Sequence, residues 1–305
     1  MTEVWRVAAR GSPLSRRQVE LAEAFVRGIR PDVRFEPLWR TSRGDRDQEH
    51  PFGALGERGI FVKEVDACVL SGESSVAVHS LKDIPTDLRD PLTVWATPPR
   101  ESPCDVLVGR RPWASWEELP EGFRLGTSSP RRQAMALYRA PQARIVPLRG
   151  NVQTRLQRLR EGFCDGVLLA EAGLLRLGLS WTGLRIDPTE DPPAPGQGVI
   201  ALVGRGPLPR DLAGLREASE PTLSEVAAER SFLRSMGGGC SDLVGAFAKS
   251  DGTGGMTLHV VQYEAQGQRR RIARAHGRYE GLEALGVEAR HRLEAATWED
   301  RREGS

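Results

Sequence analysis

The sequence has few of the features that mark metal-binding, disulfide-rich or membrane proteins. Four cysteines occur among 305 residues without a Cys-x-x-Cys pair, and the five histidines form no i, i+4 pair. Neither a zinc site nor a disulfide framework is expected, and a reducing compartment fits. No apolar run approaches the length of a membrane span, and Glu3, Arg6 and Arg10 interrupt any leader-like pattern. We therefore expect a soluble, cytoplasmic protein that binds no metal and no membrane.

Aromatic residues and lysine are also scarce. Aromatic side chains make up 6% of the chain and the net charge is +2, so a general nucleic-acid surface is not expected. An RNA-binding module built on residues 149–160 is the alternative that this near-neutral charge argues against. Only Lys63, Lys82 and Lys249 are lysines among 43 basic residues. Because arginine is spread along the chain, the position of each arginine is more informative than their number.

The order of apolar segments predicts an α/β protein. Strand-like and helix-like segments alternate from Val4 to about Leu202, which is typical of layered domains with mainly parallel sheets. Pro98-Pro99 and the proline-rich residues 191–195 break this pattern and predict two linkers. The segment between them is then an inserted domain, and the chain returns to the first sheet through Val199–Val203. A cleft is expected between the two lobes.

The pattern changes after Pro207 and Pro209 to that of a smaller α+β domain. We expect a helix from about Leu223 to Met236, three strands, and a last helix from about Glu280 to Ala296. The predicted strands are 244–248, 257–263 and 269–275. The predicted domains are 1–97 plus 197–217 (domain 1, discontinuous), 100–192 (domain 2, inserted) and 220–305 (domain 3). The polar residues 45–59 are either a mobile loop over the cleft or a surface loop without catalytic importance.

Three junctions between a strand and a helix carry arginines next to unpaired backbone amides. In 126–133, Ser128 or Ser129 can cap a helix and Pro130 suits its first turn, so amides, hydroxyls and two guanidinium groups converge. Such a junction favours carboxylates or phosphates. The segments 10–18 and 148–155 repeat the arrangement. Solvated arginines at an ordinary junction explain any single case, whereas three together indicate anion binding.

The helices after the other two junctions have apolar faces. After Ser12, the predicted face consists of Leu14, Leu21, Phe25 and Ile29. After Asn151, which can cap its helix, it consists of Val152, Leu156 and Leu159.

Two further segments contain groups that could perform chemistry. His79–Pro85 follows an apolar strand, so Lys82 and Asp83 emerge where α/β sheets bind ligands. Asp83 could transfer a proton or stabilise a transient cation, although a plain Lys-Asp loop contact is the alternative. His79 fits a hydrogen-bonded core histidine better than a base. Cys240 follows three glycines, which favours a covalent role over a structural one.

The other three cysteines, Cys68, Cys104 and Cys164, are expected to be buried structural thiols.

Taken together, these motifs resemble the porphobilinogen deaminase (hydroxymethylbilane synthase) family. The resemblance runs from Arg10 to about Ala248, and several short motifs occur in one order. They are 9–14 (ARGSPL), 59–64 (GIFVKE), 77–85 (AVHSLKDIP), 126–133 (GTSSPRRQ), 148–151 (LRGN) with 154–156 (TRL), and 172–178 (AGLLRLG).

The resemblance implies a fold, a cofactor and a reaction. The fold is α/β, with two periplasmic-binding-protein-like (type II) domains and a third, smaller α+β domain. A dipyrromethane cofactor is held by a thioether to Cys240, and four porphobilinogen units are condensed head to tail into hydroxymethylbilane with loss of ammonia. Asp83 matches the catalytic aspartate, which steadies the pyrrole nitrogens and the cationic methylene-pyrrole. The protein is expected to act as a monomer in tetrapyrrole (heme) biosynthesis, without nucleic acid or membrane partners.

The resemblance also implies which residues bind the carboxylates of cofactor and substrate. Each pyrrole carries an acetate and a propionate, so a cleft that holds several pyrroles needs several fixed cations. The matching residues are Arg10, Ser12, Gln18, Lys82, Thr127, Ser128, Ser129, Arg131, Arg132, Arg149, Gly150, Arg155 and Arg176. Three positions depart from the family pattern: Arg58, the residues after Cys240, and the hinge 196–200. A non-enzymatic two-lobed protein that binds a small anion is the alternative function.

Overall fold

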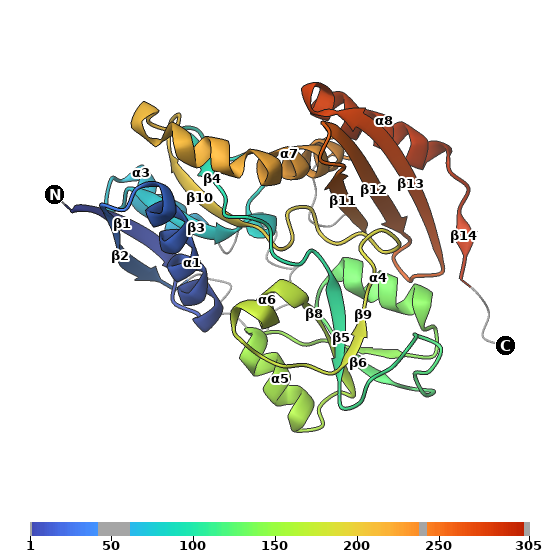
Figure 1. Ribbon diagram of the computed structural model, residues 1–305. Helices are drawn as coiled ribbons and strands as arrows, with labels where there is room; N and C mark the ends of the chain where they lie inside the picture. Colours follow the sequence, from blue (N-terminus) through green and yellow to red (C-terminus); the bar gives the residue numbers. More distant parts are fainter. Residues whose placement is uncertain (1, 42–61, 238–242, 302–305) are drawn as a thin grey trace. The chain divides into compact units, whose positions relative to one another are not determined.

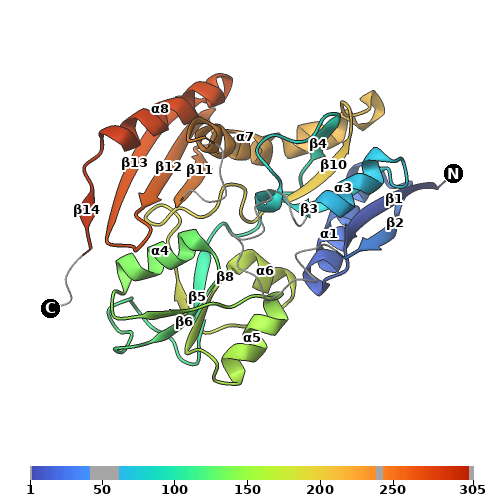
Figure 2. The same ribbon diagram turned by 180° about the vertical axis from the view of Figure 1, so that it is seen from behind.

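The computed structural model describes residues 2–41, 62–237 and 243–301, drawn in Figures 1 and 2. The chain divides into two compact units. Unit 1 consists of Met1–His50, Leu55–Ser102 and Gly196–Ser224, and unit 2 consists of Pro51–Ala54, Pro103–Pro195 and Glu225–Ser305. The two proline-rich breaks in the sequence thus fall next to two of the points where the chain passes between units, 102/103 and 195/196. The predicted boundaries of three domains are finer than this division and stay a prediction.

Unit 1 is built on a five-stranded mixed sheet in the order β2-β1-β3-β10-β4. These strands are β1 (Glu3–Arg10), β2 (Val33–Arg40), β3 (Val76–Ser80), β4 (Leu92–Ala96) and β10 (Ile200–Arg205). Strand β1 runs parallel to β2 and β3, whereas β10 runs antiparallel to β3 and β4. The return of the chain to the first sheet is confirmed. Four of the five strands run in one direction, as the prediction of mainly parallel sheets requires, and the returning strand β10 enters in the opposite direction.

The helices of unit 1 pack on this sheet through short apolar stripes. They are α1 (Pro13–Ile29) and α3 (Lys63–Leu70), with a 3-10 turn η1 (Leu81–Asp83) after β3 and another, η2 (Arg210–Leu212), before α7. The fully buried apolar side chains of α1 are Val19, Ala22 and Val26, and they contact Val7 of β1 in one core cluster. The predicted face of α1 was therefore rotated, since Leu21, Phe25 and Ile29 pack only at the margin of that core.

Unit 2 contains a second five-stranded sheet in the order β7-β6-β8-β5-β9. Its strands are β5 (Asp105–Gly109), β6 (Arg124–Gly126), β7 (Arg144–Val146), β8 (Gly166–Ala170) and β9 (Gly183–Arg185), and its helices are α4 (Pro130–Arg139), α5 (Val152–Arg160) and α6 (Glu171–Arg176). Strands β6, β7 and β8 are parallel, and β5 is antiparallel to its neighbours. Each sheet thus has its single reversed strand in the fourth place. Leu156 and Leu159 of α5 are buried, as predicted.

A four-stranded antiparallel sheet, β11-β12-β13-β14, follows in unit 2. Helix α7 (Ala213–Ser235) begins in unit 1 and passes into unit 2 after Ser224. It is followed by β11 (Val244–Ser250), β12 (Gly255–Tyr263), β13 (Arg269–Arg278), the 3-10 turn η3 (Tyr279–Gly281), α8 (Leu282–Ala295) and β14 (Glu299–Asp300). Helix α8 covers one face of β12 and β13 (Figure 1). The predicted α/β class with an α+β segment at the end is confirmed. Helix α7 begins ten residues before the predicted start, because Pro221 lies inside it instead of preceding it.

A buried carboxylate joins the two sheets of unit 2. Asp191 accepts a hydrogen bond from the Tyr263 hydroxyl at 2.6 Å and forms ion pairs with Arg139 (2.7 Å) and Arg270 (3.3 Å). Burial, followed by the nearby Asp191 charge, raises the pKa of Tyr263 well above its ordinary value. Nearby, the amide of Ala246 donates to the carbonyl of Pro193 at 2.9 Å. A buried charge is tolerated only when it is fully paired, so these contacts fix the two sheets to each other.

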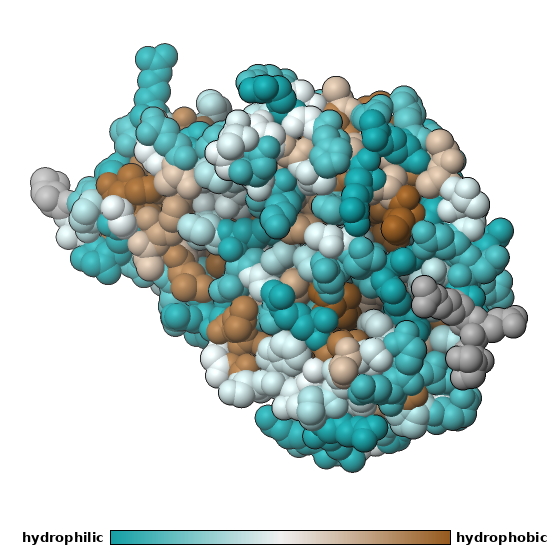
Figure 3. Space-filling view, turned by 45° about the vertical axis from the view of Figure 1, so that its right-hand side comes forward, coloured by the Kyte–Doolittle hydropathy of each residue, from teal (hydrophilic) through white to brown (hydrophobic). Residues whose placement is uncertain are grey.

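The surface shows scattered apolar side chains. Among the described residues, the exposed large hydrophobic ones are Val4 of β1, Phe163 in the turn after α5, Leu175 of α6 and Val287 of α8. The face drawn in Figure 3 is mostly hydrophilic, with separate apolar patches. Among the described residues, no helix combines the length and the apolar composition needed to cross a bilayer.

Candidate active site

The first part of the site lies where β1 passes into α1. Arg10 is the last residue of β1, and the Ser12 hydroxyl caps α1 by accepting a hydrogen bond from the Ser15 amide at 3.3 Å. Pro13 occupies the first helical position, where a missing N–H group costs nothing. The remaining amides of the first turn and the helix dipole favour an anion at this point. The predicted junction around Ser12 is confirmed.

The second part lies at the end of β3. Its residues Val76–His79 are buried, and the chain then turns through η1, which carries Lys82 and Asp83. Strands β1 and β3 are parallel neighbours, so their carboxyl ends lie at the same edge of the sheet. The fold therefore brings Arg10 and Asp83 together, although they are far apart in the sequence.

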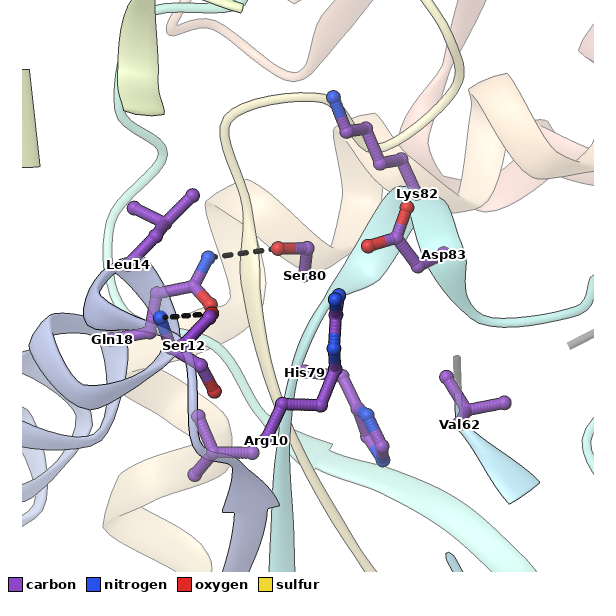
Figure 4. A pocket seen from close by; sticks show the side chains of 11 residues that line it. Arg10, Ser12, Leu14, Gln18, Val62, His79, Ser80, Lys82 and Asp83 are labelled. Atoms are coloured by element: carbon purple, nitrogen blue, oxygen red, sulfur yellow. Dashed lines mark hydrogen bonds between the residues drawn. The ribbon is translucent and has the colours of Figure 1, made fainter. Parts of the chain in front are cut away.

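These two strand ends line one pocket with a volume of about 130 Å³. Figure 4 shows the side chains of Arg10 and Asp83 extending toward its centre. Gln18 is almost fully buried, and its amide donates to the Ser80 hydroxyl at 2.8 Å, which links α1 to the end of β3. The lining residues are Arg10, Ser12, Leu14, Ser15, Gln18, Val62, Val78, His79, Ser80, Lys82 and Asp83.

His79 contributes to the wall of the pocket and not to its reactive groups. Its side chain is buried, and its Nε2 atom lies 2.8 Å from Asp66 Oδ1. The prediction of a hydrogen-bonded core histidine is thus confirmed. By contrast, the carboxylate of Asp83 is half-buried and forms no hydrogen bond with any other described residue. It can therefore face a ligand directly.

In unit 2, the junction between β6 and α4 has a different structure. Arg131 and Arg132 are buried, and both bind Asp105, the first residue of β5: Nη2 of Arg131 lies 2.5 Å from Oδ2 and Nη2 of Arg132 lies 2.7 Å from Oδ1. Ser129 occupies the N-cap position of α4 without a capping hydrogen bond. The guanidinium groups expected to form an open anion cradle thus already hold a carboxylate of the chain itself.

Asp105, Arg131 and Arg132 form a triad whose net charge depends on whether Asp105 is ionised. Burial alone would raise the pKa of Asp105, but the charges and hydrogen bonds of Arg131 and Arg132 outweigh burial and hold that pKa far below its usual range. Asp105 is therefore ionised, and the triad has one positive charge in excess. Sequence reasoning missed this contact, although a charged residue at the start of an apolar strand was a usable signal.

The other predicted residues of unit 2 follow β6, β7 and β8. Thr127 is buried and accepts a hydrogen bond from the Ser129 amide, while Asn151 caps α5 by accepting from the Thr154 amide at 2.9 Å. Gly150 has φ +102°, and a Cβ atom there would lie 2.8 Å from Thr154, so this turn requires glycine. Arg155 donates to the carbonyl of Gly150 at 2.9 Å. Because the three strands are parallel, these residues also share one sheet edge.

The model of the family "Porphobilinogen deaminase, dipyromethane cofactor binding domain" matches residues 5–207, and that of the "Porphobilinogen deaminase, C-terminal domain" matches residues 223–295. The chain belongs to the porphobilinogen deaminase family. The resemblance recognised in the sequence is thereby confirmed, together with the transferase class and the dipyrromethane cofactor of that family.

Relatives with this name match almost the whole chain. A probable porphobilinogen deaminase of Hyperthermus butylicus is 40% identical over 291 residues, which cover 94% of this chain and 95% of the relative. The porphobilinogen deaminase of Xanthomonas euvesicatoria is 40% identical and covers 92% of both chains. That of Rubrobacter xylanophilus is 40% identical and covers 84% of this chain and 83% of the relative.

Solved structures match about three quarters of this chain at low similarity. The substrate binding domain 2 of Lactococcus lactis GlnP in its open conformation has a TM-score of 0.41 at 12% identity, covering 77% of this chain and 91% of that chain. The periplasmic VFT2 domain of Bordetella pertussis BvgS has a TM-score of 0.41 at 17% identity, covering 74% and 91%.

The residues predicted from the porphobilinogen deaminase resemblance fall into three groups. Unit 1 brings Arg10, Ser12, Gln18, Lys82 and Asp83 together in the pocket. Unit 2 carries Thr127, Ser128, Ser129, Arg131, Arg132, Arg149, Gly150, Arg155 and Arg176. Cys240 and the residues 45–59 lie outside the described residues, so both predictions stay predictions.

The remaining cysteines and the basic segment of α5 make ordinary structural contacts. Cys68, Cys104 and Cys164 are buried and form no disulfide, as predicted, and burial raises the pKa of Cys68 and of Cys164. Such thiols are poor nucleophiles. Arg158 of the alternative RNA-binding segment pairs with Glu161 and stacks on Phe163. In the described part of the chain, no group of three or more His, Cys, Asp or Glu side chains could hold a metal ion.

Proposed function

We propose that this chain deaminates porphobilinogen and condenses four molecules of it into hydroxymethylbilane, with the pocket of unit 1 as the reacting centre. The observation that carries the proposal is the convergence of Arg10, Ser12, Lys82 and Asp83 within a segment matched by the dipyrromethane-binding family model. The relatives named porphobilinogen deaminase support the same activity.

The donor set of the pocket fits a pyrrole that carries carboxylates. Arg10 and Lys82 supply two cations, and the Ser12 end of α1 adds the helix dipole and unpaired amides. When bound, the dipyrromethane would supply the pyrrole carbon to which the first unit is joined, and each later unit would be joined to the end of the growing chain. We propose that the dipyrromethane is attached through a thioether to Cys240, which is supported by the burial of the three other cysteines.

Asp83 is the group proposed to act on the reacting atoms. Its carboxylate makes no hydrogen bond to the other described residues, so it can accept hydrogen bonds from pyrrole N–H groups. As the C–N bond of porphobilinogen breaks and ammonia leaves, positive charge develops on the methylene-pyrrole. A fixed carboxylate beside that charge lowers the barrier, since electrostatic stabilisation is strong in a site from which water is excluded.

The remaining predicted cations, in unit 2, are proposed to bind further carboxylates of the cofactor and the growing chain. The triad of Arg131, Arg132 and Asp105 retains one positive charge and so can still attract an anion. Scattered exposed apolar side chains support a monomer, and thiols without disulfides support a cytoplasmic location.

Intact mass under denaturing conditions, combined with turnover, tests this proposal. The purified protein should be heavier than its sequence by two linked pyrroles, and Cys240→Ser should lack that mass. Asp83→Ala should keep the added mass but consume porphobilinogen and release ammonia about 100-fold or more slowly. Asp87→Ala, at an exposed position outside the pocket, is the matched control and should react normally.

The opposite outcomes identify the alternative. An active protein of unmodified mass would contradict the covalent cofactor. Saturable binding of a small dicarboxylate without any turnover would favour the non-enzymatic two-lobed binding protein.

A further inference from the structure

Lys82 is held by a buried amide from a distant part of the sequence. Its Nζ atom donates a hydrogen bond to Oε1 of Gln197 at 3.1 Å. Gln197 is 1% exposed and lies in the segment that leads back into β10. Figure 4 shows the Lys82 side chain extending away from Arg10 and Ser12. Gln197 therefore helps to set the direction of this amine.

The backbone around Gln197 is fixed against η1. The amide of Leu81 donates to the carbonyl of Val199 at 2.9 Å. Gly196 has φ +76°, and a Cβ atom there would lie 2.3 Å from the Leu81 side chain. Only glycine satisfies both the dihedral angle and this close approach. The returning segment thus packs directly on the turn that carries Lys82 and Asp83.

The same segment is also fixed to the outgoing crossing of the chain. Arg100 Nε donates to the carbonyl of Gln197 at 3.0 Å, and the amide of Glu101 donates to the carbonyl of Gly198 at 3.0 Å. Gly198 has φ +85°, and a Cβ atom there would lie 2.5 Å from the carbonyl oxygen of Glu101. The chain segments next to the crossings at 102/103 and 195/196 are therefore bonded to each other through Gln197 and its flanking glycines.

We propose that Gln197 is a positioning residue for Lys82, which it holds ready for a ligand carboxylate and couples to the two crossings. The catalytic part of this inference rests on the proposed function. A lysine side chain has four rotatable methylene groups, so an acceptor at its end restricts where the charge lies. The Gln197 amide is neutral, so this contact places no opposite charge beside the ammonium. Any displacement of the crossings moves this acceptor and with it the amine.

Lysine labelling tests the positioning without relying on turnover. The chain has only Lys63, Lys82 and Lys249, so peptide mass spectrometry can follow reductive methylation of each one, with exposed Lys249 as the internal reference. Gln197→Met keeps the length but removes this acceptor, so the amine is no longer held by Gln197 and should react faster. The labelling ratio of Lys82 to Lys249 should rise about threefold to tenfold.

Two further variants keep the test decisive. Gln197→Glu retains an acceptor and adds a negative charge, so its ratio should fall to or below that of the wild type. Gln133→Met removes a half-buried amide in unit 2 and should leave the ratio unchanged. A ratio that is the same in the wild type, Gln197→Met and Gln197→Glu would overturn the inference, whether or not the protein turns over porphobilinogen.

Kinetics then test whether the positioning matters for substrate. Gln197→Met should raise KM for porphobilinogen about tenfold with a smaller change in kcat, since it misplaces a binding cation. In a Lys82→Met background, Gln197→Met should have no further effect, because residues that act through one contact are not additive. Fully additive losses would show that Gln197 acts independently of Lys82. A wild-type protein without turnover would instead contradict the proposed function and leave the labelling result standing.

Discussion

The two five-stranded sheets have the same pattern of strand directions, with the reversed strand in the fourth place, but their arginines have different surroundings. In the first sheet, Ile200 of β10 lies opposite Ser80, the last residue of β3. In the second sheet, Asp105 of β5 lies opposite Ala170, the last residue of β8. The first residue of the reversed strand is thus an isoleucine in unit 1 and a buried aspartate in unit 2.

The first turns of α4 and α1 differ in the same way as these two strands. After the N-cap Ser129, the second and third helical positions of α4 are Arg131 and Arg132, which bind Asp105. After the N-cap Ser12, the same positions of α1 are Leu14 and Ser15, which face no charge on β10. Similar strand-to-helix motifs therefore do not imply similar anion sites. In unit 1 the cations are half-buried at a pocket, whereas in unit 2 two of them are structural partners of the chain itself.

The largest expected effect comes from removing the carboxylate that distinguishes unit 2. Asp105→Ala leaves two buried guanidinium groups without their partner, so the free energy of unfolding should fall by about 3–5 kcal/mol in urea denaturation. The matched control is Asp165→Ala, which breaks the partly exposed pair with Arg124 and should cost about 1 kcal/mol or less. An equal loss of unfolding free energy in the two variants would mean that burial does not determine how much these ion pairs stabilise the protein.

The pH dependence of the same triad gives a second, smaller effect. Since folding lowers the pKa of Asp105, its ionised form stabilises the protein above the pKa of an unfolded aspartate, about 4, and this contribution is lost as pH falls through the lower folded value. The difference in unfolding free energy between the wild type and Asp105→Asn should therefore be constant near neutral pH and narrow below about pH 4. A difference that grows on acidification would contradict the ion pairing.

The smallest effect compares the two helix caps. Ser12→Ala removes a capping hydrogen bond from α1 and should lower the unfolding free energy by about 1 kcal/mol. Ser129→Ala removes no capping bond from α4 and should change it by less than about 0.5 kcal/mol. Thermal or urea denaturation of both variants measures the contrast. Similar losses would show that the Ser129 hydroxyl caps its helix in solution.

Local patterns predicted the elements well but not their long-range pairing. The junction at Ser12, the strand before Lys82 and the buried leucines of α5 follow from short-range periodicity and capping chemistry. Three features depend on residues more than twenty positions apart in the sequence. They are the pairing of β10 with β3, the triad at Asp105 and the contact of Gln197 with Lys82. No periodicity encodes such contacts, because they depend on how complete elements pack. The early start of α7 was missed because a proline usually ends a helix.

The contacts of the Asp191 carboxylate determine whether the chain can be shortened to a fragment without the last sheet. Tyr263 and Arg270 reach it from the antiparallel sheet, and Tyr263 also belongs to the core cluster that contains Met135 of α4. A fragment that ended before Glu225 would lose both partners and expose the apolar surface they cover. The last sheet is therefore part of its neighbour's interior, so a chain without it would need different side chains on α4.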